Sequence, residues 1–230
     1  MSADARLSPE ERAGVGQAWL EAGLGEHASV AAFARFVLHL LSLGAPAHLV
    51  REAIRAMDDE VEHARFCFGI AKRFTGMSAG PGPLNLKAVY AEPDDPESIL
   101  RAAILEGCIA ETISARCAAE ALTRLQDRSI QIPLSRIVED ESRHAELSWN
   151  FVRWMLEVHP DLASVAADCF DGALATPPAA EGDPGDGQFA VIEQFGHISH
   201  ATRVQVVQRV VENEIKPLRD AMFQRATVSI

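Results

Sequence analysis

The chain has 230 residues, enough for one large domain or two small ones. Of these residues 48% are hydrophobic but only 6% are aromatic, and this mixture favours helices over sheets. Its formal net charge of −12 argues against a general surface for nucleic acid or anionic membranes. The sequence has no signal-peptide pattern, no uninterrupted apolar run of about 18 residues and no Cys-x-x-Cys pair, so we expect a soluble cytoplasmic protein without a zinc ribbon or rubredoxin-type iron site.

The first predicted helix runs from Pro9 to about Leu43. Ser8 is a typical N-cap residue and Pro9 suits the first helical position. Steps of three and four residues trace an otherwise apolar line through Glu26, consisting of Trp19, Ala22, Glu26, Val30, Phe33, Val37 and Leu40. A lone acid in such a line has to be neutralised, paired or bound to a cation.

The second predicted helix spans about residues 47–74 and carries Glu60 and His63. Residues three apart share one face of a helix, so this carboxylate and this imidazole point the same way. Apolar residues surround the pair on the same stripe, and Asp59 directly precedes it. Residues 75–97, rich in Gly and Pro, are too many for a tight helical hairpin and predict a crossover along a bundle.

The third predicted helix, about residues 98–125, offers two acids, Glu106 and Glu111. Five residues turn an α-helix by about 500°, which leaves these acids about 140° apart, so both cannot face one site. We prefer Glu111 because its stripe is apolar apart from the acid, and we keep Glu106 as the alternative. The preferred stripe is Ile104, Cys108, Glu111, Ala115, Ala118, Leu122 and Leu125.

The fourth predicted helix begins near Pro133 and ends before His159. It repeats the Asp-Glu-x-x-His pattern as Asp140, Glu141 and His144, again within an apolar stripe. One such motif arises easily by chance in charged helices, but two copies on apolar faces indicate a buried polar centre.

The remaining sequence predicts a shorter helix over residues 162–174, a linker over 176–187 and a last helix from Ser199 to about Phe223, kinked by Pro217. We expect residues 158–230 to pack outside a bundle formed by residues 9–157, as one domain overall, or to form a homodimer contact.

Four Glu and two His converging from four helices suit a pair of divalent metal ions. Ions about 3.5–4 Å apart repel each other unless carboxylates bridge and neutralise them. Carboxylate oxygens with one imidazole per metal favour iron or manganese. We therefore predict two Fe ions, with Mn or a mixed Mn/Fe pair as alternatives.

The motifs EHAS at Glu26, DEVEHA at Asp59, EGCIAET around Glu111 and DESRHAE at Asp140 resemble those of the ferritin-like di-iron carboxylate superfamily over residues 9–157. The sequence of these motifs is most similar to that of bacterial ferritin-like domain proteins related to the tRNA-hydroxylating di-iron enzymes. The ligand layout is also similar to that of the aldehyde-deformylating oxygenases. The resemblance implies an all-α, up-down four-helix bundle with one long crossover and a di-iron centre that activates O₂ or handles peroxide.

The resemblance also implies a role for each polar residue. The metal ligands would be Glu26, Glu60, His63, Glu111, Glu141 and His144. Glu60 and Glu141 would bridge the ions, the other two Glu would be terminal ligands, and each His would bind one ion. Catalytic roles are expected for Glu60, Glu141 and above all Glu111, the natural place for a carboxylate shift.

The resemblance further implies that Asp59 and Asp140 accept the remaining N–H of the two imidazoles and fix their orientation. Small residues predict a substrate cleft between the first and third helices, on the side of the metals that faces Trp19. These residues are Ala22 or Gly23 together with Ala115 and Ala118.

The function expected from these features is that of a di-iron oxidase or monooxygenase. It would use O₂, an external electron donor and a small or carrier-bound organic substrate. A rubrerythrin-like peroxidase or ferroxidase is an alternative, weakened by the lack of a rubredoxin-type motif. A tRNA hydroxylase is a second alternative, which the charge of −12 opposes. The third is a bundle that binds no metal.

Overall fold

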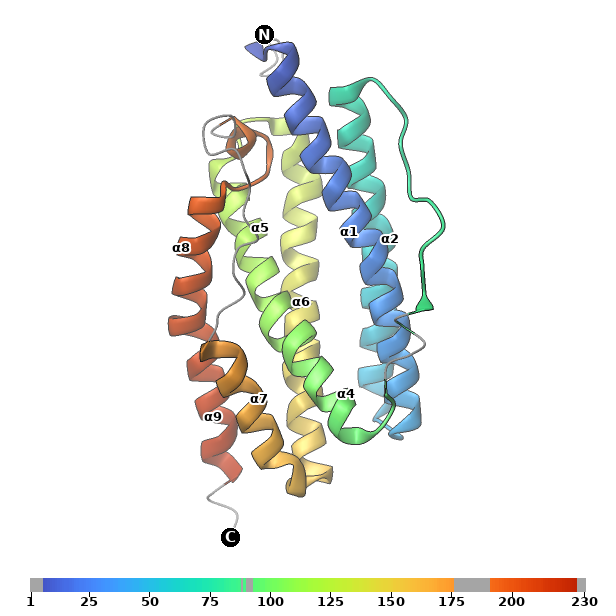
Figure 1. Cartoon of the computed structure of the whole chain (residues 1–230), viewed down its shortest axis with the longest axis vertical. Helices are drawn as coiled ribbons and strands as arrows, with labels where there is room; N and C mark the ends of the chain where they lie inside the picture. Colours follow the sequence, from blue (N-terminus) through green and yellow to red (C-terminus); the bar gives the residue numbers. More distant parts are fainter. Residues whose placement is uncertain (1–5, 88, 90–92, 176–190, 227–230) are drawn as a thin grey trace.

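The computed structural model describes residues 6–87, 89, 93–175 and 191–226, and over these residues the protein is all-α (Figure 1). Its helices pack antiparallel to one another. The main helices are α1 (Pro9–Ser42), α2 (Ala47–Thr75), α4 (Pro96–Ala102), α5 (Thr112–Arg124), α6 (Arg128–Val158), α7 (Ala163–Ala175), α8 (His200–Val210) and α9 (Lys216–Ala226). Two π-helical segments, η2 (Ala103–Glu111) and η5 (Val211–Ile215), and two 3₁₀ turns, η3 (Pro160–Leu162) and η4 (Ile192–Phe195), complete the described elements.

Helices α1 and α2 form a long antiparallel hairpin with the predicted bounds. The Ser8 side chain accepts a hydrogen bond from the Glu11 N–H and the Glu11 carboxylate accepts one from the Ser8 N–H, which together cap α1. The helices come close at Gly16, where a Cβ would lie 2.5 Å from Thr75 Cγ2, and at Gly23, where one would lie 3.0 Å from the Phe68 ring. Small residues on α1 therefore serve helix packing here.

The apolar stripes predicted for the second and fourth helices face the core along their whole length. Every residue of both stripes is buried, including the polar pairs at their centres. The stripes are Leu49, Ala53, Ala56, Glu60, His63, Cys67, Ile70 and Phe74 on α2, and Leu134, Ile137, Glu141, His144, Ser148, Phe151 and Met155 on α6.

Helix α2 ends at one end of the bundle, and α4 begins at the opposite end (Figure 1). The chain that joins them coincides with the predicted crossover, of which residues 88 and 90–92 lie outside the described part. Asp95 caps α4 by accepting a hydrogen bond from the Ser98 N–H, so the third helix begins two residues earlier than expected.

The third helix is π-helical over Ala103–Glu111, which the sequence did not indicate. In a π-helix the hydrogen bonds join residues i and i+5, so residues five apart are separated by only about one turn. The predicted separation of about 140° between Glu106 and Glu111 assumed α-helical geometry, which does not hold in η2. Both residues line the same pocket, although only Glu111 belongs to a group of candidate metal ligands.

The fourth helix begins at Arg128, five residues before the predicted start at Pro133. Asp127 caps it by accepting a hydrogen bond from the Ser129 N–H. The side chain of Arg73, on α2, binds both Asp127 and Ser129. These contacts stabilise the first turn of α6 and so compensate for the hydrogen bond that Pro133, which has no N–H, cannot donate.

The C-terminal helices pack against the outside of the bundle, with α7 next to η2 and α4, and α8 next to α5 (Figure 1). Trp149 stacks on Phe170 at a centroid distance of 5.4 Å, which joins α6 and α7 in one hydrophobic cluster. Ser199 caps the last helix as predicted. Ahead of Pro217 that helix passes through η5, and it continues to Ala226.

The predicted linker at residues 176–187 lies outside the described residues. The division into a bundle over 9–157 and an extension over 158–230 stays a prediction, although the shared cluster spans both parts. Among the helices described, none has the length and apolar character needed to span a membrane.

Candidate metal centre

The structure brings the six predicted ligand residues together at the centre of the bundle. One group comprises Glu26, Glu60, His63 and Glu141, and a second comprises Glu111, Glu141 and His144, so Glu141 belongs to both. Within each group one potential ligand atom per residue lies within 4.8 Å of the others. These buried Glu/His clusters could bind metal ions. The residues come from α1, α2, α6 and the end of η2.

The two Asp-Glu-x-x-His motifs face each other across the antiparallel helices α2 and α6. Each motif's Asp therefore meets the histidine of the other helix. His63 Nε2 lies 3.1 Å from Asp140 Oδ2, and His144 Nε2 lies 3.5 Å from Asp59 Oδ2. Because a carboxylate can only accept, each Nε2 carries the proton of its pair.

The other ring nitrogen of each histidine faces the glutamates. His63 Nδ1 lies 3.4 Å from Glu141 Oε1 and 3.5 Å from Glu26 Oε2. His144 Nδ1 lies 3.1 Å from Glu60 Oε1 and 3.8 Å from Glu141 Oε1. Glu60 and Glu141 thus lie between the two imidazoles, the position that bridging ligands need.

Arg136 and Arg143, which the sequence analysis did not single out, hold the two aspartates. Arg136 Nε lies 2.8 Å from Asp140 Oδ2, and Arg143 Nη1 lies 3.1 Å from Asp59 Oδ2. Arg143 also binds Asp140. The spacing was a usable signal, because residues 136 and 143 stand four before and three after Asp140 on one helix face.

Two glutamates of the cluster have raised pKa values. Burial, with the neighbouring carboxylates Glu60 and Glu141, raises the pKa of Glu26 to about 8. Burial also raises the pKa of Glu111 well above its ordinary value, and Glu141 adds to the effect. Both shifts arise first from burial and then from the neighbouring carboxylates.

The pKa values of Glu60 and His63 move in the directions that stabilise opposite charges. Burial opposes both shifts, but the close contacts with the imidazoles of His144 and His63 lower the pKa of Glu60 to about 2. Contacts with Glu141, Glu26 and Glu60 raise the pKa of His63 to about 12. Without another cation, the histidine has to be protonated to sit among these carboxylates.

Buried polar atoms that lack a hydrogen-bond partner indicate whether the cluster suits metal ions. Glu60 Oε2, His63 Nδ1 and His144 Nδ1 are buried and have no hydrogen-bond partner. If the Nε2–H groups are donated to aspartates, both Nδ1 atoms face carboxylate oxygens, which is repulsive unless Nδ1 is protonated or a metal ion lies between them. The residues therefore fit metal binding.

Formal charge supports the same fit. The four glutamates and two aspartates carry six negative charges, and Arg136 and Arg143 carry two positive ones. With neutral imidazoles, four negative charges remain, and two divalent cations would balance them.

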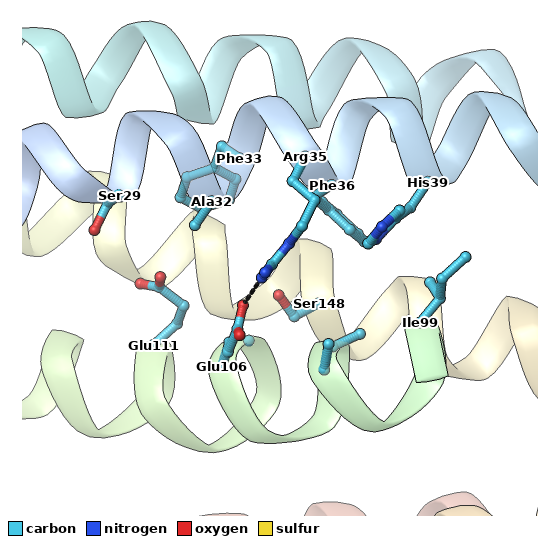
Figure 2. Close-up of a pocket in the computed structure, with 13 residues that line it drawn as sticks. Ser29, Ala32, Phe33, Arg35, Phe36, His39, Ile99, Glu106, Glu111 and Ser148 are labelled. Atoms are coloured by element: carbon cyan, nitrogen blue, oxygen red, sulfur yellow. Dashed lines mark hydrogen bonds and ion pairs between the residues drawn. The ribbon is translucent and has the colours of Figure 1, made fainter. Parts of the chain in front are cut away.

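Of the two acids offered by the third helix, Glu111 lies in the cluster and Glu106 does not. Glu106 is exposed and forms an ion pair with Arg35 of α1. The two acids nonetheless line one pocket between α1 and the α4–η2 segment, shown in Figure 2.

Two pockets lie between the first and third helices, and neither matches the expected cleft in detail. The pocket on the Trp19 side is lined by Ala22 and by the cluster glutamates. Gly23 instead packs on Phe68. Ala118 packs in a hydrophobic cluster with Trp19, and Ala115 lines a separate surface pocket. Of the small residues named for the cleft, Ala22 alone lines this pocket, whereas Gly23 and Ala118 serve packing.

Comparisons with protein-family models, with curated proteins and with solved structures gave no match for this chain.

Proposed function

We propose that the chain is a ferritin-like protein whose central cluster holds two iron ions, and that it is a non-haem di-iron oxidase or monooxygenase acting on an organic substrate. The observation that carries the proposal is the convergence of Glu26, Glu60, His63, Glu111, Glu141 and His144 on one buried centre, with Glu141 common to both groups. The positions of the ends of α2 and α4 suit a ferritin-like crossover (Figure 1).

The donor set favours iron over most other ions. Four carboxylates and two imidazoles provide hard oxygen ligands and one nitrogen per metal, which suit iron or manganese. The four cysteines of the chain are buried, free and outside both groups of candidate ligands, so thiolate-seeking ions have no advantage. Manganese, or a mixed pair, would satisfy the same ligands.

When bound, two ferrous ions would supply electrons for the reduction of O₂. The chain's own residues would orient and neutralise this centre. Asp59 and Asp140 hold the Nε2–H groups, so that both Nδ1 atoms point inward. Arg136 and Arg143 hold these aspartates in place through ion pairs.

Glu111 is the ligand best placed to change position. It is only partly buried, stands at the junction of η2 and α5, and lines the pocket of Figure 2. A pocket that reaches a ligand residue favours an organic substrate over a ferroxidase, which would oxidise iron itself.

Metal analysis of the purified chain tests the proposal. We expect about two iron or manganese ions per chain, and loss of most of the metal in Glu60→Gln and His144→Gln. Glu62→Gln, on an exposed residue of α2 paired with Arg65, is the matched control and should retain the metal. A metal content below one ion per chain, or equal contents in all three variants, would contradict the proposal.

Oxygen uptake separates the candidate reactions. An oxygenase consumes O₂ in proportion to an organic substrate and an electron donor. A ferroxidase consumes it in proportion to added Fe²⁺, with no organic substrate.

A further inference from the structure

The pocket in Figure 2 has an apolar wall and one buried cationic side chain. Its volume is about 60 Å³, and it is open to solvent. Ala32, Phe33 and Phe36 of α1 face Ile99, Ala102 and Ala103 of α4 and η2. A ligand bound there would lie only partly inside the pocket, held by apolar contact and a few polar groups. The pocket ends at Glu111, next to the metal cluster.

Arg35 is the one arginine among the residues that line the pocket, which include no lysine. Its side chain is only 12% exposed, whereas that of its partner Glu106 is 57% exposed. A guanidinium that has lost most of its water needs an anion, and a carboxylate fits its planar fork. The ion pair crosses the pocket from α1 to η2 (Figure 2).

The exposure of Glu106 makes this pair replaceable. An exposed carboxylate regains its hydration when it leaves, so exchanging it for another carboxylate at Arg35 costs little net free energy. Glu106 also belongs to the π-helical segment that carries Glu111 at its other end.

We propose that Arg35 recognises an organic carboxylate whose apolar body lies against Phe36, Ile99, Ala102 and Ala103, and that Glu106 occupies the carboxylate position until this ligand binds. The group now on Arg35 is a carboxylate, which shows that the geometry of the site accepts one. The proposal rests on the proposed function in one respect: the ligand would be the substrate of the metal centre.

Calorimetric titration with hexanoate and with hexanamide tests the recognition step. The two probes share an apolar body and differ in charge. Hexanoate should bind at least about tenfold more tightly than hexanamide, as expected for a charge-assisted hydrogen bond. Because hexanoate could also coordinate metal ions, the titration is done with both metal-loaded and metal-free protein, and the preference should persist in the metal-free protein.

Variants of the two partners should have opposite effects. Arg35→Gln should weaken hexanoate binding at least about tenfold and leave hexanamide binding unchanged. Glu106→Gln should tighten hexanoate binding about two- to fivefold, because it removes the carboxylate that competes for Arg35. The size of the effect follows from the free energy of a half-exposed ion pair. Arg65→Gln, on the exposed Arg65–Glu62 pair of α2, is the control and should change neither.

A purely structural ion pair gives a different result. Both partner variants would then weaken binding or leave it unchanged, and that outcome overturns the proposal, as does equal affinity for the two probes. If Arg35→Gln fails to fold, the sign of the Glu106→Gln effect still decides. Absence of metal with intact hexanoate selectivity would reject the di-iron function and leave the carboxylate site standing.

Discussion

At Gly107, η2 lies close against α6, and replacing this glycine should disturb both packing and the metal centre. A Cβ at this position would lie 2.3 Å from Ser148 Oγ and 2.6 Å from Ser148 Cβ. Ordinary contacts of a Cβ are 3.4–4 Å, so the helices would have to separate by about an ångström. Overpacking of this kind typically costs about 1–3 kcal/mol.

The matched control for Gly107→Ala is Gly69→Ala, because Gly69 is an exposed residue of α2 with no atom near its Cβ position. An unhindered Gly→Ala change in a helix should stabilise by about 0.5–1 kcal/mol. We therefore expect the free energy of unfolding of Gly107→Ala to lie about 1–3 kcal/mol below that of the control. Urea denaturation of the metal-free chain, followed by circular dichroism, measures both.

Gly107→Ala should also disturb the candidate metal ligands, because Gly107 lies close to them. Gly107 is four residues before Glu111, and the Ser148 hydroxyl donates to the carbonyl of His144. Separating η2 from α6 would move Glu111 away from Glu141 and His144, so Gly107→Ala should also bind less metal. Ser148→Gly removes the clashing atoms and should reduce the cost of Gly107→Ala in a double-mutant cycle. Equal stability of Gly107→Ala and the control, or no coupling to Ser148, would refute this reasoning.

Two further predictions concern the paired histidine and a buried histidine outside the cluster. Asp140→Ala should lower iron affinity about 10–100-fold, because His63 loses the acceptor that orients its ring; competition with a chelator measures this, and the exposed Glu139→Ala is the control. Burial lowers the pKa of His197, whose ring lies 4.5 Å from that of Trp19, to about 4. The folded chain therefore binds fewer protons than the unfolded chain between about pH 6.5 and 4. Its free energy of unfolding should fall by about 1–3 kcal/mol as the pH is lowered through this window, and by less in His197→Gln. Urea denaturation at several pH values measures this. The same dependence on pH in both proteins would contradict the assignment.

Local sequence determined the helices and the chemistry available at the centre. Ser8 and Ser199 cap the helices that they were predicted to cap, because a cap depends on groups a few residues apart. The three-residue spacing of Glu60 and His63, repeated at Glu141 and His144, places each pair on one helix face irrespective of the rest of the fold. Apolar neighbours at helical spacing then require those faces to be buried.

Tertiary structure decided which groups meet. The crossed pairs of His63 with Asp140 and His144 with Asp59 depend on the register of two antiparallel helices that are far apart in sequence. The π-helical segment, which no local pattern indicated, brings Glu106 and Glu111 to one pocket and gives Glu106 a partner in Arg35. Contacts between distant residues of this kind are set by the packing of whole helices, because spacing along one chain segment carries no information about the helix it will face.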